Sequence, residues 1–139
     1  MYYLDTSLLV SAFSHEATTI HVQDWLQSRP EKTATSDWTI VEFSSAMSIK
    51  VRTGQISIGL RDDALRSFVA YRGGMISLPV TPDDFRVAAR FSEHHETGIR
   101  ANDALHLAVA HAFGATLCTL DRRLAKAGPQ LGVAAELVA

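Results

Sequence analysis

Four acidic residues stand at positions where carboxylates can do chemistry: Asp5, Glu42, Asp103 and Asp121. Asp5 directly follows a short apolar segment, residues 2–4, and Asp121 follows another, residues 115–120. If both segments are parallel strands, their carboxyl ends meet at one edge of a sheet, where open α/β sheets bind ligands. Asp also favours turns and helix starts, so a structural role for each residue is the alternative.

Glu42 and Asp103 are predicted to lie in helices. Glu42 is surrounded by apolar residues in a helix predicted from about Asp37 to Arg52. An unpaired buried carboxylate is costly, so Glu42 should have a partner or lie beside a cleft; a metal ion, Lys50, an arginine or a backbone amide would each serve as the partner. Asp103 lies in the first turn of another predicted helix, where interaction with the helix dipole is an alternative to a ligand role.

A cluster of these four carboxylates would suit a divalent cation. Mg²⁺ and Mn²⁺ prefer carboxylate oxygens and keep several water ligands, which leaves room for phosphate oxygens of a substrate. Two ions about 3.5–4 Å apart can activate an attacking water and stabilise the leaving oxygen of a phosphodiester. Crowded carboxylates repel one another until a cation neutralises them. Such hydrolysis needs no Cys, Ser or His nucleophile.

Short apolar runs alternate with amphipathic segments along the chain, which predicts an α/β fold with a parallel sheet. We predict strands over residues 2–4, 32–36, 75–80, 115–120 and, at an edge, 132–137. The predicted helices span residues 6–13, 19–28, 37–52, 59–71, 82–96, 102–113 and 122–127. Asn102 is expected to be the N-cap of its helix, and Gly128-Pro129 is expected to end the last one.

The 139 residues, 47% hydrophobic and 20% charged, predict a single globular domain over 1–139. The single Cys118 lies in an apolar run, so we expect a buried thiol in a reducing compartment. No basic leader and no apolar stretch of roughly 18 residues is visible, so we expect a cytoplasmic protein. The net charge of −2 neither supports nor excludes a nucleic-acid substrate, because cations bound to four carboxylates would reverse its sign.

Four segments together resemble the PIN-domain family, and within it the VapC-type toxins of bacterial toxin–antitoxin pairs. The segments are residues 3–7 (YLDTS), 41–43 (VEF), 100–108 (RANDALHLA) and 119–124 (TLDRRL). They occur in the family's order, with typical spacing, over essentially the whole chain. Each segment alone is weak, whereas all four in order are specific.

The resemblance implies a three-layer α/β/α, Rossmann-like fold with a central, mostly parallel sheet of four to five short strands. It also implies a Mg²⁺-dependent endoribonuclease in which Mn²⁺ can substitute, and a homodimer inhibited by a small cognate antitoxin that covers the active site. The four acids correspond to the family's catalytic and metal-binding quartet. Ser7 and Thr119 match hydroxyl positions that would orient carboxylates or waters. Arg100 and Arg122 are candidates for phosphate contacts, although a solvated surface role fits each equally well.

Three other interpretations stay open on the sequence. A receiver-type phospho-acceptor module would need adjacent carboxylates after the first strand and an acceptor Asp after a middle strand, whereas Asp5 stands alone and no Asp ends residues 75–80. A non-catalytic binding module would use the acids only as helix caps. A nuclease acting on DNA would need the same acids. His106, three residues after Asp103, lies on a neighbouring face of the helix; an approach to the cleft is one interpretation, and a satisfied structural histidine is the preferred one.

Overall fold

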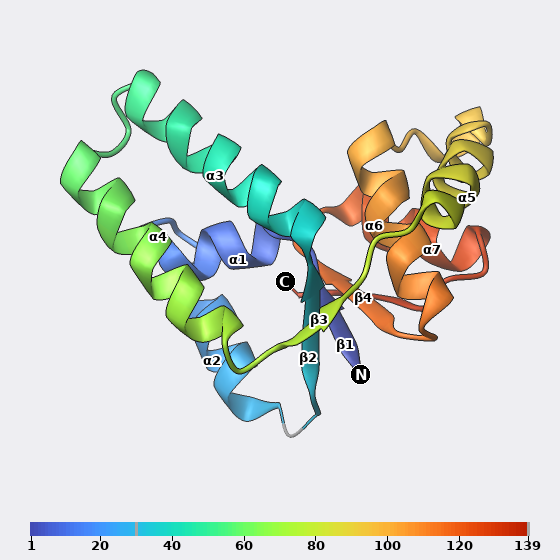
Figure 1. The fold of residues 1–139 in the computed structure, drawn as a ribbon, viewed down its shortest axis with the longest axis horizontal. Coiled ribbons are helices and arrows are strands. Elements are labelled where there is room, and N and C mark those ends of the chain that lie inside the picture. The colour runs from blue at the N-terminus through green and yellow to red at the C-terminus, as the bar shows by residue number, and fades with distance from the viewer. Residues whose placement is uncertain (30, 139) are drawn as a thin grey trace.

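The computed structural model describes residues 1–29 and 31–138, and its centre is a sheet of short strands (Figure 1). The strands are β1 (Tyr2–Leu4), β2 (Thr33–Ser36), β3 (Ile76–Leu78), β4 (Thr116–Thr119) and β5 (Ala135–Leu137). They are ordered β3-β2-β1-β4-β5, and every neighbouring pair is parallel. The predicted parallel sheet of four to five strands is therefore confirmed, and the last strand lies at an edge as expected.

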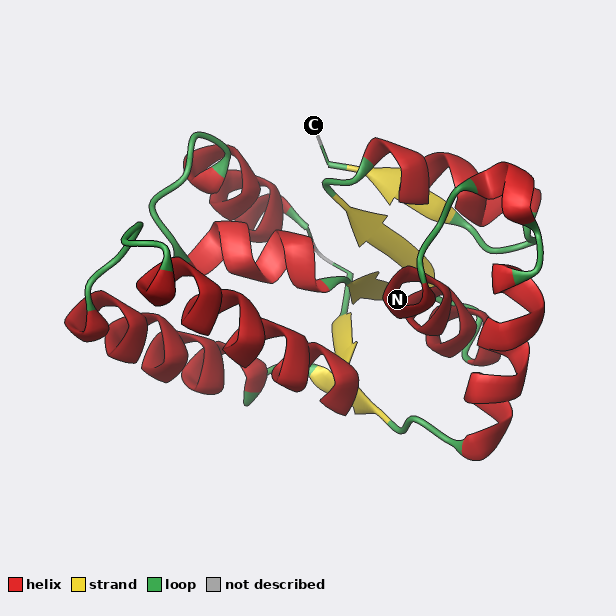
Figure 2. Ribbon diagram, turned by 90° about the horizontal axis from the view of Figure 1, so that it is seen from above, coloured by secondary structure: helices red, strands yellow, loops and turns green. Residues whose placement is uncertain are grey.

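Helices cover both faces of this sheet. They are α1 (Thr6–Phe13), α2 (Thr19–Ser28), α3 (Asp37–Arg52), α4 (Ile58–Arg72), α5 (Pro82–Ser92), α6 (Ala101–Ala112) and α7 (Arg122–Gln130). Seen from above, α1 to α4 lie on one side of the strands and α5 to α7 on the other (Figure 2). The predicted three-layer α/β/α architecture is confirmed. Among the described residues, no helix combines the length and the apolar character that a membrane span requires.

Alternating side chains of the central strands divide the core in two. Leu4 of β1 and Cys118 of β4 pack into the cluster formed with α1 to α4. Their neighbours Tyr3 and Leu117 pack into the cluster formed with α6 and α7. This alternation is the two-residue period of a strand buried on both faces. Burial raises the pKa of the Cys118 thiol to about 12, in agreement with the buried thiol expected from the sequence.

The strand register brings the ends of β1 and β4 together. Leu4 is the partner of Cys118, and the backbone N–H of Asp5 donates to the Cys118 carbonyl at 3.1 Å. Asp5 therefore lies beside Thr119, the last residue of β4. The convergence of the two strand ends that the sequence predicted is present in the fold.

Two helix ends differ from the prediction by more than one residue. Helix α7 continues through Gly128 and Pro129, so the end expected at residue 127 is wrong. A Cβ on Gly128 would stand 2.7 Å from the Ala135 Cβ and 2.9 Å from the Val133 carbonyl. This glycine serves the close approach of α7 to β5, a contact that local sequence does not reveal. Helix α5 ends at Ser92, and a separate 3₁₀ turn over His95–Thr97 follows it.

Candidate active site

All four sequence-predicted acids line one pocket of about 220 Å³ at the carboxyl ends of β1 and β4. The complete lining is Asp5, Thr6, Ser7, Glu42, Asn102, Asp103, His106 and Asp121. The acids come from the end of β1, the middle of α3, the first turn of α6 and the segment after β4. Parallel topology and helix packing thus gather side chains that lie far apart in sequence.

Asp5 is the most buried of the four acids and is held by three hydrogen bonds. Its Oδ1 accepts from the Ser7 hydroxyl at 2.6 Å and from the Leu8 backbone N–H at 3.2 Å, which caps α1. Its Oδ2 accepts from the Thr119 hydroxyl at 2.5 Å. Burial raises the pKa of Asp5, and these hydrogen bonds oppose that rise. Ser7 and Thr119 therefore stand where the resemblance placed them, in contact with a carboxylate.

Asp121 is exposed and oriented by the start of α7. Its Oδ1 accepts from the backbone N–H groups of Arg123 at 2.8 Å and Leu124 at 3.2 Å. Its own N–H donates to the Thr119 hydroxyl at 2.9 Å. Thr119 therefore links Asp5 to Asp121. The helix-cap role and the ligand role are compatible, because capping uses one oxygen and, within the described residues, the other accepts no hydrogen bond.

Asp103 is the third residue of α6, and its side chain caps the start of this helix, a role that the sequence predicts for Asn102. Helix α6 begins at Ala101, with Arg100 as its N-cap residue, and the Arg100 N–H donates to Asp103 Oδ2 at 3.3 Å. The prediction that Asn102 is the N-cap is wrong, because Asn102 is instead drawn to Glu42. Burial raises the pKa of Asp103, and the nearby carboxylates of Asp121 and Asp5 raise it further. The site thus holds repelling negative charges in close proximity.

Glu42 is held by side chains from two other helices. Its Oε1 accepts from the Thr6 hydroxyl at 2.7 Å and from His106 Nε2, and its Oε2 accepts from the Asn102 amide at 3.1 Å. Burial alone would raise the pKa of Glu42, but the hydrogen bonds from His106, Thr6 and Asn102 outweigh it and lower the pKa. Among the described residues, Glu42 accepts no hydrogen bond from Lys50, from an arginine or from a backbone amide, the protein partners considered from the sequence. Lys50 pairs instead with Glu16, at 2.7 Å.

Two arginines stand beside the carboxylates. A second pocket, of about 530 Å³, shares Asn102, Asp103 and Asp121 with the first and is completed by Gly98, Arg100, Arg122 and Arg123. Within residues 1–29 and 31–138, neither Arg100 nor Arg122 forms an ion pair. Their charges are therefore available to an anion that approaches Asp103 and Asp121. Whether they contact phosphate stays a prediction.

The donor set fits a hydrated hard cation better than a closed cage. Over the described part of the chain, no three His, Cys, Asp or Glu side chains are arranged to hold one metal ion among them. Mg²⁺ is typically bound through one or two carboxylates and completes its shell with waters and substrate phosphate, so it does not need such a cage. Asp103 Oδ1 and Asp121 Oδ2 accept no hydrogen bond from any described residue. Together with the raised pKa of Asp103, this makes the pair suited to Mg²⁺ or Mn²⁺.

The side chains that bind Glu42 were not among the predicted site residues; they are Thr6, Asn102 and His106. Asn102 and His106 are four residues apart in α6 and therefore lie on one face of it, which both present to Glu42. That spacing was a signal in the sequence. Thr6 and Tyr3 gave no comparable signal, because their partners lie far away in the sequence, in α3, in α6 and at the end of β2. His106 is buried and hydrogen-bonded, as expected of a structural histidine, and it also lines the acidic pocket.

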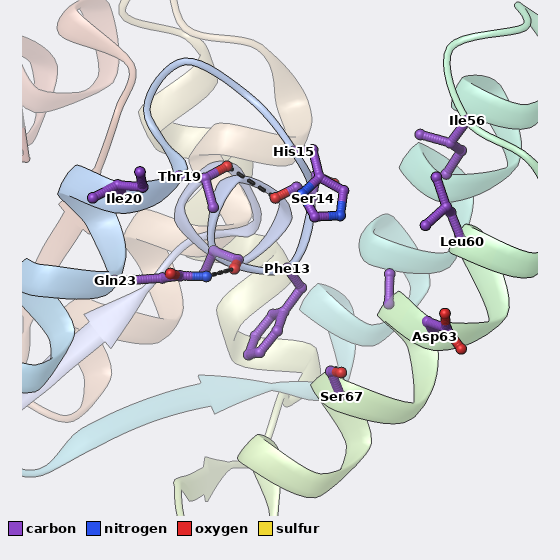
Figure 3. A pocket seen from close by; sticks show the side chains of 12 residues that line it. Phe13, Ser14, His15, Thr19, Ile20, Gln23, Ile56, Leu60, Asp63 and Ser67 are labelled. Carbon is purple, nitrogen blue, oxygen red and sulfur yellow. Dashed lines mark hydrogen bonds between the residues drawn. The ribbon is translucent and has the colours of Figure 1, made fainter.

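A third pocket, of about 390 Å³, is separate from the acids. It lies between the α1–α2 connection and α4, where Phe13, Ile56 and Leu60 line it together with His15 and Asp63 (Figure 3). The Gln23 amide donates to the Ala12 carbonyl at 2.7 Å and thereby ties α2 to α1 at this place. None of the four predicted site acids lines this pocket, so it does not compete with them as the reaction site.

Comparison with known families decides the classification. The family model described as PIN domain matches residues 2–128. The chain belongs to the PIN-domain family. The match spans all four segments on which the resemblance rests. Every residue that lines the acidic pocket therefore lies within the matched region.

Solved structures share the fold of this PIN domain. VapC20 of Mycobacterium tuberculosis, described as a toxin that cleaves the sarcin–ricin loop, is 20% identical, with 92% of this chain and 95% of that chain covered and a TM-score of 0.73. FitAcB of Neisseria gonorrhoeae is 19% identical, with 99% and 98% covered and a TM-score of 0.71. VapBC2 of Rickettsia felis, solved with a DNA fragment from its promoter, is 18% identical, with 98% and 97% covered and a TM-score of 0.70. No curated protein sequence matches the chain. At these identities the structural likeness establishes the fold.

Proposed function

We propose that this PIN domain is a Mg²⁺- or Mn²⁺-dependent endoribonuclease that acts as the toxin of a type II toxin–antitoxin pair. The observation that carries the proposal is the single pocket lined by Asp5, Glu42, Asp103 and Asp121 in a chain of this family. Similarity to a toxin described as cleaving the sarcin–ricin loop favours RNA over DNA as the substrate.

The chain's own residues divide the work of the proposed reaction. Asp103 and Asp121 each present one carboxylate oxygen that accepts no hydrogen bond from a described residue, and Ser7 and Thr119 fix the orientation of Asp5. When bound there, Mg²⁺ or Mn²⁺ supplies an activated water and neutralises charge on the phosphate. Arg100 and Arg122 flank the adjoining pocket and attract the phosphate backbone electrostatically.

An antitoxin partner and a homodimer belong to the same proposal. Solved relatives of this fold include toxin–antitoxin complexes, one of them from Klebsiella pneumoniae. Beside Glu42, a groove of about 610 Å³ is lined by Trp38, Val41 and Ile49, and Val41 and Ile49 are exposed. An antitoxin segment with apolar side chains would bury these residues and cover Glu42, which would block access to the acids. The homodimer rests on the family resemblance alone.

The test of the proposed function is the chemistry of the RNA ends. The parent protein is incubated with total cellular RNA in Mn²⁺ or in chelator, and the cut ends are mapped at nucleotide resolution. We expect cuts at defined positions in Mn²⁺ and none in chelator. Attack by water leaves a phosphate monoester on one side of each cut and a hydroxyl on the other.

Two results would contradict the proposal. Cutting that persists in chelator and leaves 2′,3′-cyclic phosphates would show attack by the RNA's own 2′-hydroxyl instead of a metal-activated water. Cutting of single-stranded DNA but not of RNA would reassign the substrate. A matched DNA oligonucleotide is therefore included as a control.

A further inference from the structure

A buried chain of hydrogen bonds connects the sheet to Glu42 through His106. The Tyr3 hydroxyl of β1 lies 2.8 Å from the Ser36 hydroxyl at the end of β2 and 2.7 Å from His106 Nδ1 in α6. On the other side of the ring, His106 Nε2 is hydrogen-bonded to Glu42 Oε1. Tyr3 is 0% exposed and His106 is 2% exposed, so water cannot replace these bonds. This series of hydrogen bonds begins in the core and ends at the acidic pocket.

The partners of the imidazole determine its orientation. An ionised Glu42 only accepts hydrogen bonds, so Nε2 must carry a proton toward it. In the neutral ring Nδ1 is then an acceptor, and the Tyr3 hydroxyl donates to it. A tyrosine hydroxyl is protonated at neutral pH, so Tyr3 can donate to Nδ1. The Ser36 hydroxyl in turn donates to the Tyr3 oxygen. Each side-chain polar atom in this series of hydrogen bonds therefore has a partner.

Glu42 has little other freedom once His106 is in place. Thr6 also donates to Oε1, and Asn102 donates to Oε2, so both carboxylate oxygens are held from helices other than α3. A glutamate has three side-chain torsions and would otherwise sample several rotamers. Of the three donors, His106 is the most deeply buried and is itself braced by Tyr3 and Ser36. It is therefore the rigid member of the set.

We propose that His106, braced by Tyr3 and Ser36, is a positioning residue that fixes the Glu42 carboxylate at the acidic pocket. The inference rests on the proposed function, because Glu42 is one of the four acids that line the pocket to which that function assigns the metal. His106 acts through Glu42 and does not touch the substrate. Outer hydrogen bonds of this kind are known to change metal affinity by about 10–100-fold when they are removed.

The test compares variants at His106 and Tyr3 with matched controls. His106→Leu removes the hydrogen bonds of both ring nitrogens, His106→Gln keeps an amide donor, and Tyr3→Phe removes a single oxygen from the brace. His111→Gln, at an exposed histidine of the same helix, and Tyr2→Phe, at the neighbouring tyrosine of the same strand, are the controls. For each protein we would measure the Kd for Mn²⁺ by calorimetry, the Tm in chelator and in Mn²⁺, and kcat and KM for RNA.

We expect His106→Leu to weaken Mn²⁺ binding by about 10–100-fold and to reduce the Mn²⁺-induced rise in Tm. His106→Gln should recover part of the affinity, and Tyr3→Phe should show a smaller loss in the same direction. The loss in activity should appear in kcat, with KM for RNA unchanged, because the arginines that attract RNA are untouched. Both controls should match the parent.

The positioning role is overturned if the variants fold and bind Mn²⁺ with the parent's Kd, even where their Tm in chelator is lower. That pattern would mean that the chain of bonds is only structural. If His106→Leu does not fold, Tyr3→Phe decides by the same criterion. If the parent itself binds no Mn²⁺, the proposed function fails and the positioning role fails with it, and this outcome is recognised without any variant.

Discussion

Asp5→Asn is expected to reduce metal-dependent RNA cleavage by on the order of 100-fold or more, because removing about 3 kcal/mol of transition-state stabilisation has that effect on a rate. The substitution keeps the size of the side chain and removes its negative charge from the acidic pocket. An Asn oxygen can still accept from Ser7 and Leu8, so the cap of α1 is retained. Cleavage is measured with a defined RNA in Mn²⁺, under single-turnover conditions.

Asp84→Asn is the matched control for this loss. Asp84 is as buried as Asp5, at 4% exposure for each, and it also caps a helix, since it accepts from the Thr81 backbone N–H at 2.8 Å. It lies in α5, outside the acidic pocket. Asp84→Asn should lower stability and leave the cleavage rate per folded molecule unchanged. Equal losses of activity in both variants would mean that the effect of Asp5→Asn comes from general destabilisation.

Asp103→Asn is expected to raise the Tm in chelator and to remove most of the stabilisation that Mn²⁺ gives the parent. The pKa of Asp103 is raised from 3.8 by burial and by the carboxylates of Asp121 and Asp5. A group with a raised pKa stabilises the fold only while it is protonated. The contribution of Asp103 to the free energy of unfolding is therefore complete below the ordinary pKa of an aspartate and is lost as the pH rises through the raised pKa. At neutral pH the charge therefore destabilises the metal-free fold, and a neutral Asn relieves the repulsion while its oxygen still accepts from the Arg100 N–H.

The measurement is thermal unfolding of parent and Asp103→Asn at pH 7, each in chelator and in Mn²⁺. A cation at about 100 times its Kd stabilises the folded parent by about 2.7 kcal/mol, which corresponds to a rise in Tm of roughly 10 °C for a domain of this size. In Asp103→Asn the Tm in chelator should be higher and the rise in Mn²⁺ much smaller. Repeating the chelator scan near pH 4 provides the control, since the difference between the two proteins should shrink there. A lower Tm for Asp103→Asn in chelator at pH 7 would contradict the repulsion argument.

The parts of the site that follow from backbone topology were predictable from the sequence. Asp5 and Asp121 each follow an apolar run, and parallel pairing of those runs is enough to bring the two residues to one edge. The apolar alternation around Tyr3, Leu4, Leu117 and Cys118 likewise follows from a strand covered on both faces. Patterns of this kind are local, and the parallel sheet converts them into proximity.

The parts that depend on contacts between distant helices were not predictable. Asn102 has a strong local preference for the N-cap position, but its amide donates to Glu42 of α3. Helix α6 starts at Ala101, one residue before the predicted start. Gly128 signals a helix end, yet it sits inside α7 because Ala135 of β5 leaves no space for a side chain. In both cases a tertiary contact outweighs a local preference. Thr6 could not be predicted as a partner of Glu42 for the same reason, whereas Asn102 and His106 share one face of α6 by their spacing.

The most direct test of the acidic pocket as a metal centre is anomalous diffraction at the manganese edge. Crystals of the parent protein are soaked in Mn²⁺ and compared with crystals of Asp103→Asn treated in the same way. We predict an anomalous peak in the parent within coordination distance, about 2.0–2.6 Å, of Asp103 or Asp121, and its loss in the variant. Manganese bound only elsewhere on the protein at a saturating concentration, or an equal peak in the variant, would contradict the central claim.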